Sequence, residues 1–195
     1  TAVRLGRWDG CVSFFSMGGQ TYVNMLDEIL PIIEAEGYNI NLTDDRPPLE
    51  LSFNEIDANY LADTKWPIGH PAQGQPIVLR DYQVETINKF LENPQCLQEI
   101  ATGAGKTIIT ATLSQLIEPY GRSIVIVPNK SLVTQTESDY KTIGLDVGVY
   151  YGERKEFDKQ HTVCTWQSLN NMLKKTKKFE AEVNIGDFLE GVVCV

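Results

Sequence analysis

A glycine-rich segment with one lysine and one hydroxyl residue, Ala101-Thr-Gly-Ala-Gly-Lys-Thr107, could bind phosphate. Its glycines, Gly103 and Gly105, allow a tight turn that points backbone N–H groups at phosphate oxygens. A helix that begins near Lys106 would direct its positive end at the same place. The lysine would reach the β- and γ-phosphates, and the Thr107 hydroxyl would bind Mg²⁺. We therefore predict a site for ATP and Mg²⁺ formed by Thr102, Gly103, Ala104, Gly105, Lys106 and Thr107, in which Lys106 and Thr107 also contribute to catalysis.

The segment departs from the general phosphate-loop pattern at one position. That pattern has a glycine five residues before Gly105, where this chain has Ile100. A glycine-rich turn that binds nothing is the alternative. The expected order of a strand, then the turn, then a helix is the context of a true phosphate loop and favours binding.

Helices and apolar strands alternate from residue 79 onward, which predicts βαβ units, a mainly parallel sheet and an α/β fold. The run Ser123–Val127 is β-branched and typical of a strand that is buried on both faces. The other strands are expected at 96–100, 147–151, 162–165 and 191–195. Helices are expected at 80–92, 106–118, 131–140, with Ser131 as the N-cap, and 167–173.

The chain before residue 76 has a different composition. Residues 1–45 predict a small α+β domain, with a hairpin at 5–16, an amphipathic helix at 22–36 and a short strand at 38–42. Residues 46–75 contain four of the nine prolines and predict a linker with one short helix near 54–61. Residues 76–195 form the predicted phosphate-binding lobe.

Two segments together resemble the opening motifs of the superfamily 2 helicases. They are Leu79-Arg-Asp-Tyr-Gln83 and the phosphate loop, whose first position is relaxed in that family. The resemblance implies a first RecA-like motor lobe in which Gln83 reads the adenine edge and Leu79 and Arg80 line the base pocket. A glutamine amide suits this role because it can donate and accept at once. A capped amphipathic helix that carries no ligand is the alternative for this segment.

Three later segments resemble the nucleic-acid contacts of the same family. The strand and turn that end at Pro128, Asn129 and Lys130 resemble the motif that holds strand phosphates, with Asn129 where threonine is usual. Gly152 lies in a short glycine-containing segment of the same surface, and Thr165 and Gln167 lie in a later motif that touches the DNA backbone. Each segment alone could be an ordinary strand–turn–helix, whereas their order and spacing favour a DNA partner, single-stranded or branched.

The opening Arg4-Leu-Gly-Arg-Trp-Asp-Gly10 resembles the start of phage helicases in this superfamily, which implies an accessory domain that contacts branched DNA. Arg7 and Trp8 could supply charge and base stacking, and packing of Trp8 on the following helix is the alternative. In this family a strand that ends in paired carboxylates comes next, and the run Gly191–Val195 resembles that strand. We therefore expect a fragment that ends before the second helicase motif, lacks the second lobe, and binds ATP without hydrolysing it.

Composition excludes some classes of protein. The net charge of −9 gives no general affinity for nucleic acid, so DNA binding needs a local basic patch. No apolar run is long enough to span a bilayer, and no signal peptide is visible, so we expect a cytoplasmic protein, in the host cytoplasm if it comes from a phage. The four cysteines lack the spacing of a zinc site, and we expect them to be reduced and in or near the core.

These observations favour the front part of an ATP-dependent DNA helicase or translocase that acts on branched or recombining DNA. A non-catalytic module that binds nucleotide and DNA is one alternative, and the motor subunit of a restriction enzyme is another. A small-molecule kinase would lack the upstream glutamine and would carry an arginine-rich lid, which this sequence does not show.

Overall fold

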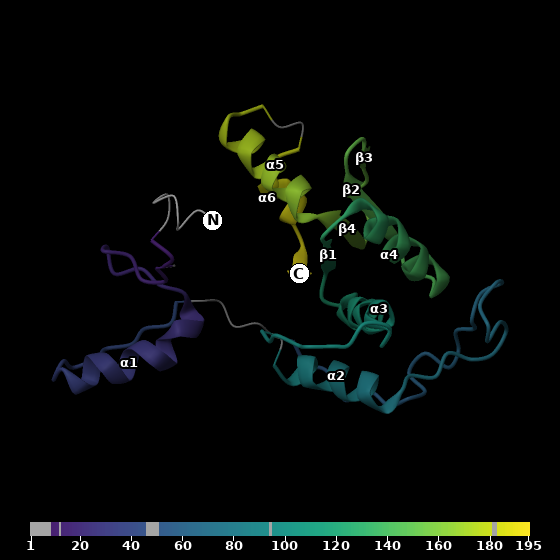
Figure 1. Ribbon diagram of the computed structural model, residues 1–195, viewed down its shortest axis with the longest axis horizontal. Helices are drawn as coiled ribbons and strands as arrows, with labels where there is room; N and C mark the ends of the chain where they lie inside the picture. The colour runs from purple at the N-terminus through teal and green to yellow at the C-terminus, as the bar shows by residue number, and fades with distance from the viewer. Residues whose placement is uncertain (1–8, 12, 46–50, 94, 181–182) are drawn as a thin grey trace. The chain divides into compact units, whose positions relative to one another are not determined.

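The computed structural model describes residues 9–11, 13–45, 51–93, 95–180 and 183–195, and it divides the chain into two compact units (Figure 1). The first unit is Thr1–Leu49 and the second is Glu50–Val195.

The first unit is built around one helix. A 3-10 turn, Val23–Met25, leads into α1, Leu26–Ala35, which has Asp27 and Glu28 in its first turn and ends before Gly37, whose φ is 82°. The predicted strand at 38–42 is absent because no partner strand lies beside it. The predicted hairpin lies partly outside the described residues, and its described part has no internal strand pairing; Phe15 forms an isolated antiparallel bridge with Thr21 instead. Among its described residues this unit has no buried side chain.

The second unit contains a five-stranded sheet in the order β3-β2-β4-β1-β5. Its strands are β1, Arg122–Val127; β2, Val147–Tyr151; β3, Arg154–Lys155; β4, His161–Thr165; and β5, Val192–Cys194. Parallel pairs join β2 to β4, β4 to β1 and β1 to β5, and only β3 is antiparallel. The predicted α/β class with a mainly parallel sheet is therefore confirmed.

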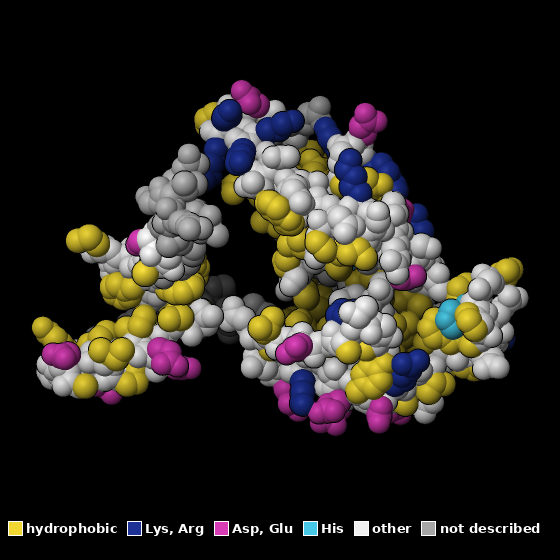
Figure 2. Space-filling view, in the orientation of Figure 1, with side chains coloured by type: hydrophobic (Ala, Val, Ile, Leu, Met, Phe, Trp, Pro, Cys, Tyr) yellow, Lys and Arg dark blue, Asp and Glu magenta, His cyan; other side chains and the backbone are white. Residues whose placement is uncertain are grey.

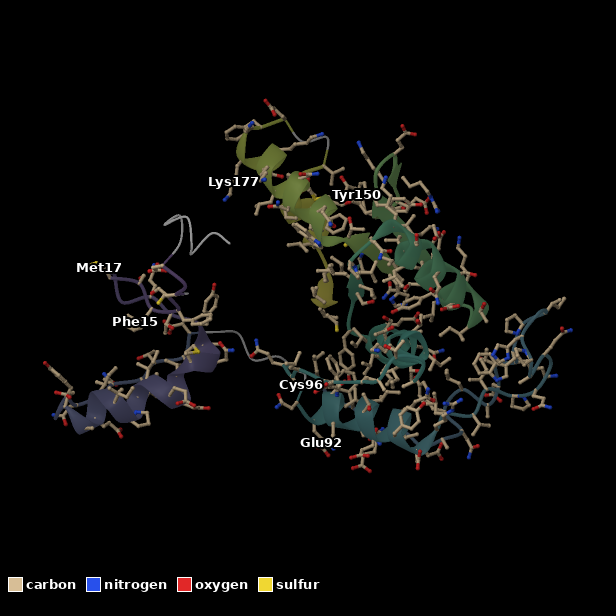
Figure 3. The ribbon with its side chains drawn as sticks, in the orientation of Figure 1. Phe15, Met17, Glu92, Cys96, Tyr150 and Lys177 are labelled. Carbon is tan, nitrogen blue, oxygen red and sulfur yellow. The ribbon has the colours of Figure 1, made fainter. Side chains whose placement is uncertain are left out.

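Helices cover both faces of this sheet. The helices of this unit are α2, Asp81–Glu92, which packs on α3; α3, Lys106–Ile117; α4, Lys130–Thr142; α5, Trp166–Lys177; and α6, Ile185–Leu189. Neighbouring residues of one strand face opposite ways, so Ile124 joins a core with Met172 and Phe188 of α5 and α6, while Val125 packs on the core with α3 and α4. On the α6 side, Tyr150 of β2, which is labelled in Figure 3, meets Phe188 edge-on, with ring centroids 5.1 Å apart.

Some local predictions were wrong. Residues 96–100 do not form a strand, and residues 54–61 form an irregular segment followed by turns instead of a helix. The segment from residue 51 to 75, expected as part of a linker, belongs to the second unit and contributes Ile56 and Leu61 to its core. Asn129, and not Ser131, is the N-cap of α4. Cys11 and Cys96 are exposed, although all four cysteines were expected in or near the core.

Within the described part of the chain, no helix combines the length and the apolar character needed to cross a membrane.

Candidate nucleotide site and nucleic-acid interface

The phosphate loop has the backbone that its glycines were expected to allow. Gly103 and Gly105 have φ values of 81° and 80°, in the left-handed region that favours glycine. Gly105 is the N-cap of α3, and Lys106 is the first residue of that helix. The free N–H groups at this helix start are therefore beside the loop, as a phosphate site requires. The exposed Lys106 side chain donates from Nζ to the Ala101 carbonyl, 3.0 Å away.

The start of α2 is tied directly to the phosphate loop. Gln83 Nε2 donates to the Ala104 carbonyl at 3.0 Å, and the Tyr82 hydroxyl donates to the same oxygen at 2.9 Å. The Arg80 backbone N–H donates to Gln83 Oε1 at 2.9 Å. Gln83 thus lies almost fully buried against the loop, and its amide keeps one N–H and one lone pair for a ligand.

A cavity of about 610 Å³ opens between the start of α2, the phosphate loop and α4. This volume is in the range of ordinary ligand sites. All of the predicted nucleotide residues line it, namely Leu79, Arg80, Gln83, Thr102, Gly103, Ala104, Gly105, Lys106 and Thr107. The structure therefore brings the two sequence motifs to one cavity, although about twenty residues separate them.

Two aromatic residues of this cavity were missed in the sequence. Trp66 and His70 stack face to face, with ring centroids 3.9 Å apart and an interplanar angle of 9°, and both line the cavity. Two backbone hydrogen bonds hold the stack, from Trp66 N to Gln75 O and from Gly74 N to Trp66 O, both 3.0 Å. A proline-rich segment gave no sign of this role, because the stack forms only when the segment folds back toward α2.

One wall of the cavity is a face of α4, which was also missed. Its contributors are Leu132, Gln135, Asp139 and Thr142. Asp139 and Thr107 both line this cavity. Burial raises the pKa of Asp139, and interaction with the Thr107 side chain opposes that change in part.

Oxygen donors are available for a magnesium ion at this point. The Thr107 hydroxyl and the Asp139 carboxylate are of the type that Mg²⁺ prefers, and Mg²⁺ commonly takes few protein ligands together with waters and phosphate oxygens. Asp139 is the one carboxylate among the described residues that line the cavity. Nowhere in the described ranges do three His, Cys, Asp or Glu side chains gather as a metal cluster.

The predicted nucleic-acid residues follow three neighbouring parallel strands. Pro128, Asn129 and Lys130 follow β1, Gly152 follows β2, and Thr165 ends β4. Because β2, β4 and β1 are adjacent and parallel, these positions share one edge of the sheet. Lys130 also approaches Gly152, since a Cβ atom placed there would be 3.7 Å from Lys130 Nζ.

Two of these residues act as helix caps. Asn129 Oδ1 accepts from Leu132 N at 3.0 Å, and Thr165 Oγ1 accepts from Ser168 N at 3.3 Å. Thr165 is also nearly fully buried, so its hydroxyl is engaged by α5, whereas Gln167 is exposed. Arg7 and Trp8 lie outside the described residues.

Charge is unevenly distributed over the second unit. Figure 2 shows Lys and Arg side chains gathered near α5 and the β2–β3 hairpin, and Asp and Glu side chains over α2. The lysines of α5, Lys174, Lys175 and Lys177, are in its last turn, as Figure 3 shows for Lys177. They are therefore about a helix length from the Thr165 cap, roughly 16 Å.

Comparisons with known proteins identify a family and several similar solved structures. Residues 76–187 match the family described as "Type III restriction enzyme, res subunit". No curated protein matches the chain. A structure of the UvsW helicase from bacteriophage T4 has a TM-score of 0.64 at 21% identity and covers 87% of this chain and 63% of that chain. A second T4 UvsW structure has a TM-score of 0.61 at 20% identity, with 91% and 37% covered.

This chain spans less than two thirds of either UvsW chain, and the likeness at such low identity concerns the fold. That fold is the expected RecA-like lobe. The family match extends over more than half of the chain and includes both the phosphate loop and the strand-end loops. The chain therefore belongs to the family of the type III restriction enzyme res subunit, within the superfamily 2 helicases, and it resembles UvsW in fold.

Proposed function

We propose that this chain is the ATP- and DNA-binding front part of an ATP-dependent DNA helicase or translocase. The observation that carries the proposal is the single cavity shared by the phosphate loop and the start of α2. One group of its residues is suited to phosphates, and the other, around Gln83 and the Trp66–His70 stack, is suited to a flat polar base.

In this proposal different residues of the cavity bind different parts of the nucleotide. Backbone N–H groups of the loop and Lys106 hold the phosphates, and Thr107 holds Mg²⁺, which would neutralise phosphate charge when bound. Leu79 and the Trp66–His70 pair pack on the base, and the remaining N–H and lone pair of Gln83 select adenine. Arg80 would lie at the edge of the base.

This chain is proposed to bind ATP without turning it over. Hydrolysis in this superfamily needs paired carboxylates that hold the metal and orient water. Among the described residues that line the cavity, Asp139 is a lone carboxylate. We therefore expect bound ATP to remain intact for as long as it stays bound.

DNA is proposed to lie along the loops that follow the parallel strands. Lys130, Gly152 and Gln167 would contact the sugar-phosphate backbone of the DNA. The two UvsW structures match more of this chain than Glu50–Val195 contains, which favours a parent of that kind acting on branched or recombining DNA. The family's description favours a second candidate, the motor subunit of a restriction enzyme. Tighter binding of a forked DNA than of a linear duplex would favour the first candidate, a helicase that acts on branched DNA.

Nucleotide affinity tests the core of the proposal. Isothermal titration with ADP and Mg²⁺ should show binding, and Lys106→Ala should abolish it because the lysine supplies the positive side chain at the phosphates. Lys175→Ala, which removes an exposed lysine from α5, is the matched control and should leave the affinity unchanged.

Gln83→Ala should reduce the preference for ADP over GDP, measured in the same titrations. Unchanged affinity in Lys106→Ala would refute the phosphate site. Equal binding of ADP and GDP by the unsubstituted protein would refute the role of Gln83.

A further inference from the structure

A carboxylate faces the metal-binding position of the phosphate loop from a different element. Asp139 lies on the α4 face that lines the cavity, where Leu132, Gln135, Asp139 and Thr142 follow each other at intervals of three and four. This side chain is half-buried, it lines the same cavity as Thr107, and interaction with the Thr107 side chain lowers its pKa against the effect of burial. Asp139 therefore stands beside the position where the β- and γ-phosphates would bind.

A negative side chain at this position opposes the binding of a bare polyphosphate. Two like charges a few ångströms apart repel by several kcal/mol at most in a partly buried site, and less where solvent enters. Neither of the cationic side chains Lys106 and Arg80, which line the cavity, forms an ion pair with Asp139 in this structure. Lys106 donates to the Ala101 carbonyl, and Arg80 donates to the Tyr82 hydroxyl.

A divalent cation would reverse the effect of the same carboxylate. Thr107 and Asp139 offer two oxygen atoms from two elements, and an ion held there would be attracted by the carboxylate and by the phosphates together. With the ion present the carboxylate contributes to binding, and without it the carboxylate repels the nucleotide.

We propose that Asp139 makes nucleotide binding by this phosphate loop conditional on a divalent cation. The proposal rests on the proposed function, since it assumes that the loop binds ATP and ADP. Asp139 acts through charge, and it reaches the ion directly or through a bound water.

A purely positioning role for Asp139 predicts a different result. If the carboxylate only orients the Thr107 hydroxyl, its removal changes ADP affinity by a similar factor with and without the metal. If its charge matters, its removal weakens binding with the metal and strengthens binding without it. The ratio of the two affinities separates these cases.

The experiment measures ADP affinity of the full chain by isothermal titration, once with excess Mg²⁺ and once with excess EDTA. The unsubstituted protein should lose affinity by about tenfold or more in EDTA. Asp139→Asn keeps the shape of the side chain and removes its charge, and it should lose less than about threefold. Asp146→Asn is the matched control, because Asp146 pairs with Lys159 away from the cavity, and it should behave as the unsubstituted protein does.

A second readout follows the metal itself. Mn²⁺ bound in the presence of ADP, measured by electron paramagnetic resonance, should be weakened by Asp139→Asn and unaffected by Asp146→Asn. This signal does not depend on ATP turnover.

The outcomes separate this inference from the proposed function. Equal ADP affinity of the unsubstituted protein in Mg²⁺ and EDTA overturns the inference without any variant, as does an unchanged ratio in Asp139→Asn. Absence of ADP binding in both conditions overturns the proposed function as well.

Discussion

Gly105 is the residue of the phosphate loop where the structure leaves least freedom. Its φ of 80° is in the left-handed region, and a Cβ atom there would be 2.6 Å from Gln83 Nε2. Gln83 cannot turn aside easily, because its amide is bonded to both Arg80 and Ala104. The same side chain that would read the base therefore also requires glycine in the loop.

Gly105→Ala should lower the free energy of unfolding by about 2–3 kcal/mol, because it combines an unfavourable φ with this close contact. Gly103→Ala is the control, since Gly103 has a φ of 81° but nothing within 4 Å of its Cβ position. That substitution should cost about 1 kcal/mol. Urea unfolding of the two variants measures the difference. If both variants lose the same free energy of unfolding, the Gln83 side chain moves aside without cost.

Some residues of the site could be predicted from the sequence, and others could not. The phosphate loop and the segment around Gln83 are contiguous, and each pattern has a local physical reason. Trp66, His70 and Asp139 reach the cavity only through tertiary packing. Thr165 carried a motif, yet its hydroxyl caps α5. The roles of the predicted residues toward ligands stay predictions.

Among the secondary-structure elements, the strands that helices cover were predicted correctly from the sequence. β1 and β2 are rich in apolar or β-branched residues because helices pack on them, and the predicted bounds agree with the structure to within a residue. Residues 38–42 and 96–100 show a similar local pattern but have no neighbouring strand to pair with. Asn129 and Ser131 are both good N-cap residues, and only the backbone that leaves β1 decides between them.

An ion-pair network fixes the β2–β3 hairpin to α4. Glu137 of α4 accepts from Arg154 Nη1 and Nη2 at 2.8 and 2.9 Å and from Lys141 Nζ at 2.6 Å. Hydrogen bonds from Arg154 lower the pKa of Glu137 to about 2, against the opposing effect of burial. Gly152 lies in the turn of this hairpin, so the network also holds one of the strand-end loops.

The lowered pKa of Glu137 predicts a specific loss of stability in acid. Because the folded-state value is below the ordinary value of 4.5, the contribution is fully present above pH 4.5 and is lost as the pH falls toward about 2. Arg154→Met should reduce the free energy of unfolding at pH 7 by about 1–2 kcal/mol, a discounted figure because Arg154 is partly exposed. The variant should also show a flatter dependence on pH in this range.

Urea unfolding at several pH values measures both effects. Lys89→Met breaks an ion pair between two well-exposed side chains, Lys89 and Glu85, and serves as the control with no expected change. A pH dependence in Arg154→Met equal to that of the unsubstituted protein would contradict the assignment.

For the whole molecule, a net charge of −9 means that affinity for DNA must come from a local arrangement of cations. The exposed Lys130 side chain lies beside Gly152 at the shared strand edge, whereas acidic side chains gather over α2 (Figure 2). Nucleic acid should therefore approach from the strand-end side, and its binding should weaken steeply as salt rises.

Lys130→Ala should weaken binding of a single-stranded oligonucleotide by a similar factor for different sequences. It should also reduce the slope of log affinity against log salt by about 0.7, the value for one phosphate contact on a single strand. Fluorescence anisotropy across a salt series measures both quantities.

Lys89→Ala on α2 is the control and should have the same salt slope as the unsubstituted protein. If Lys130→Ala also has that slope, Lys130 does not contact the DNA.

Helix α4 begins at the Asn129 cap and carries Asp139 ten residues later, about 15 Å along its axis. A helix is stiff over this length, so displacement of one end is transmitted to the other. If both ligands bind as proposed, each becomes an allosteric effector of the other, because both contact the same rigid helix, α4. Thermodynamic reciprocity then requires that the factor by which DNA changes nucleotide affinity equals the factor by which nucleotide changes DNA affinity.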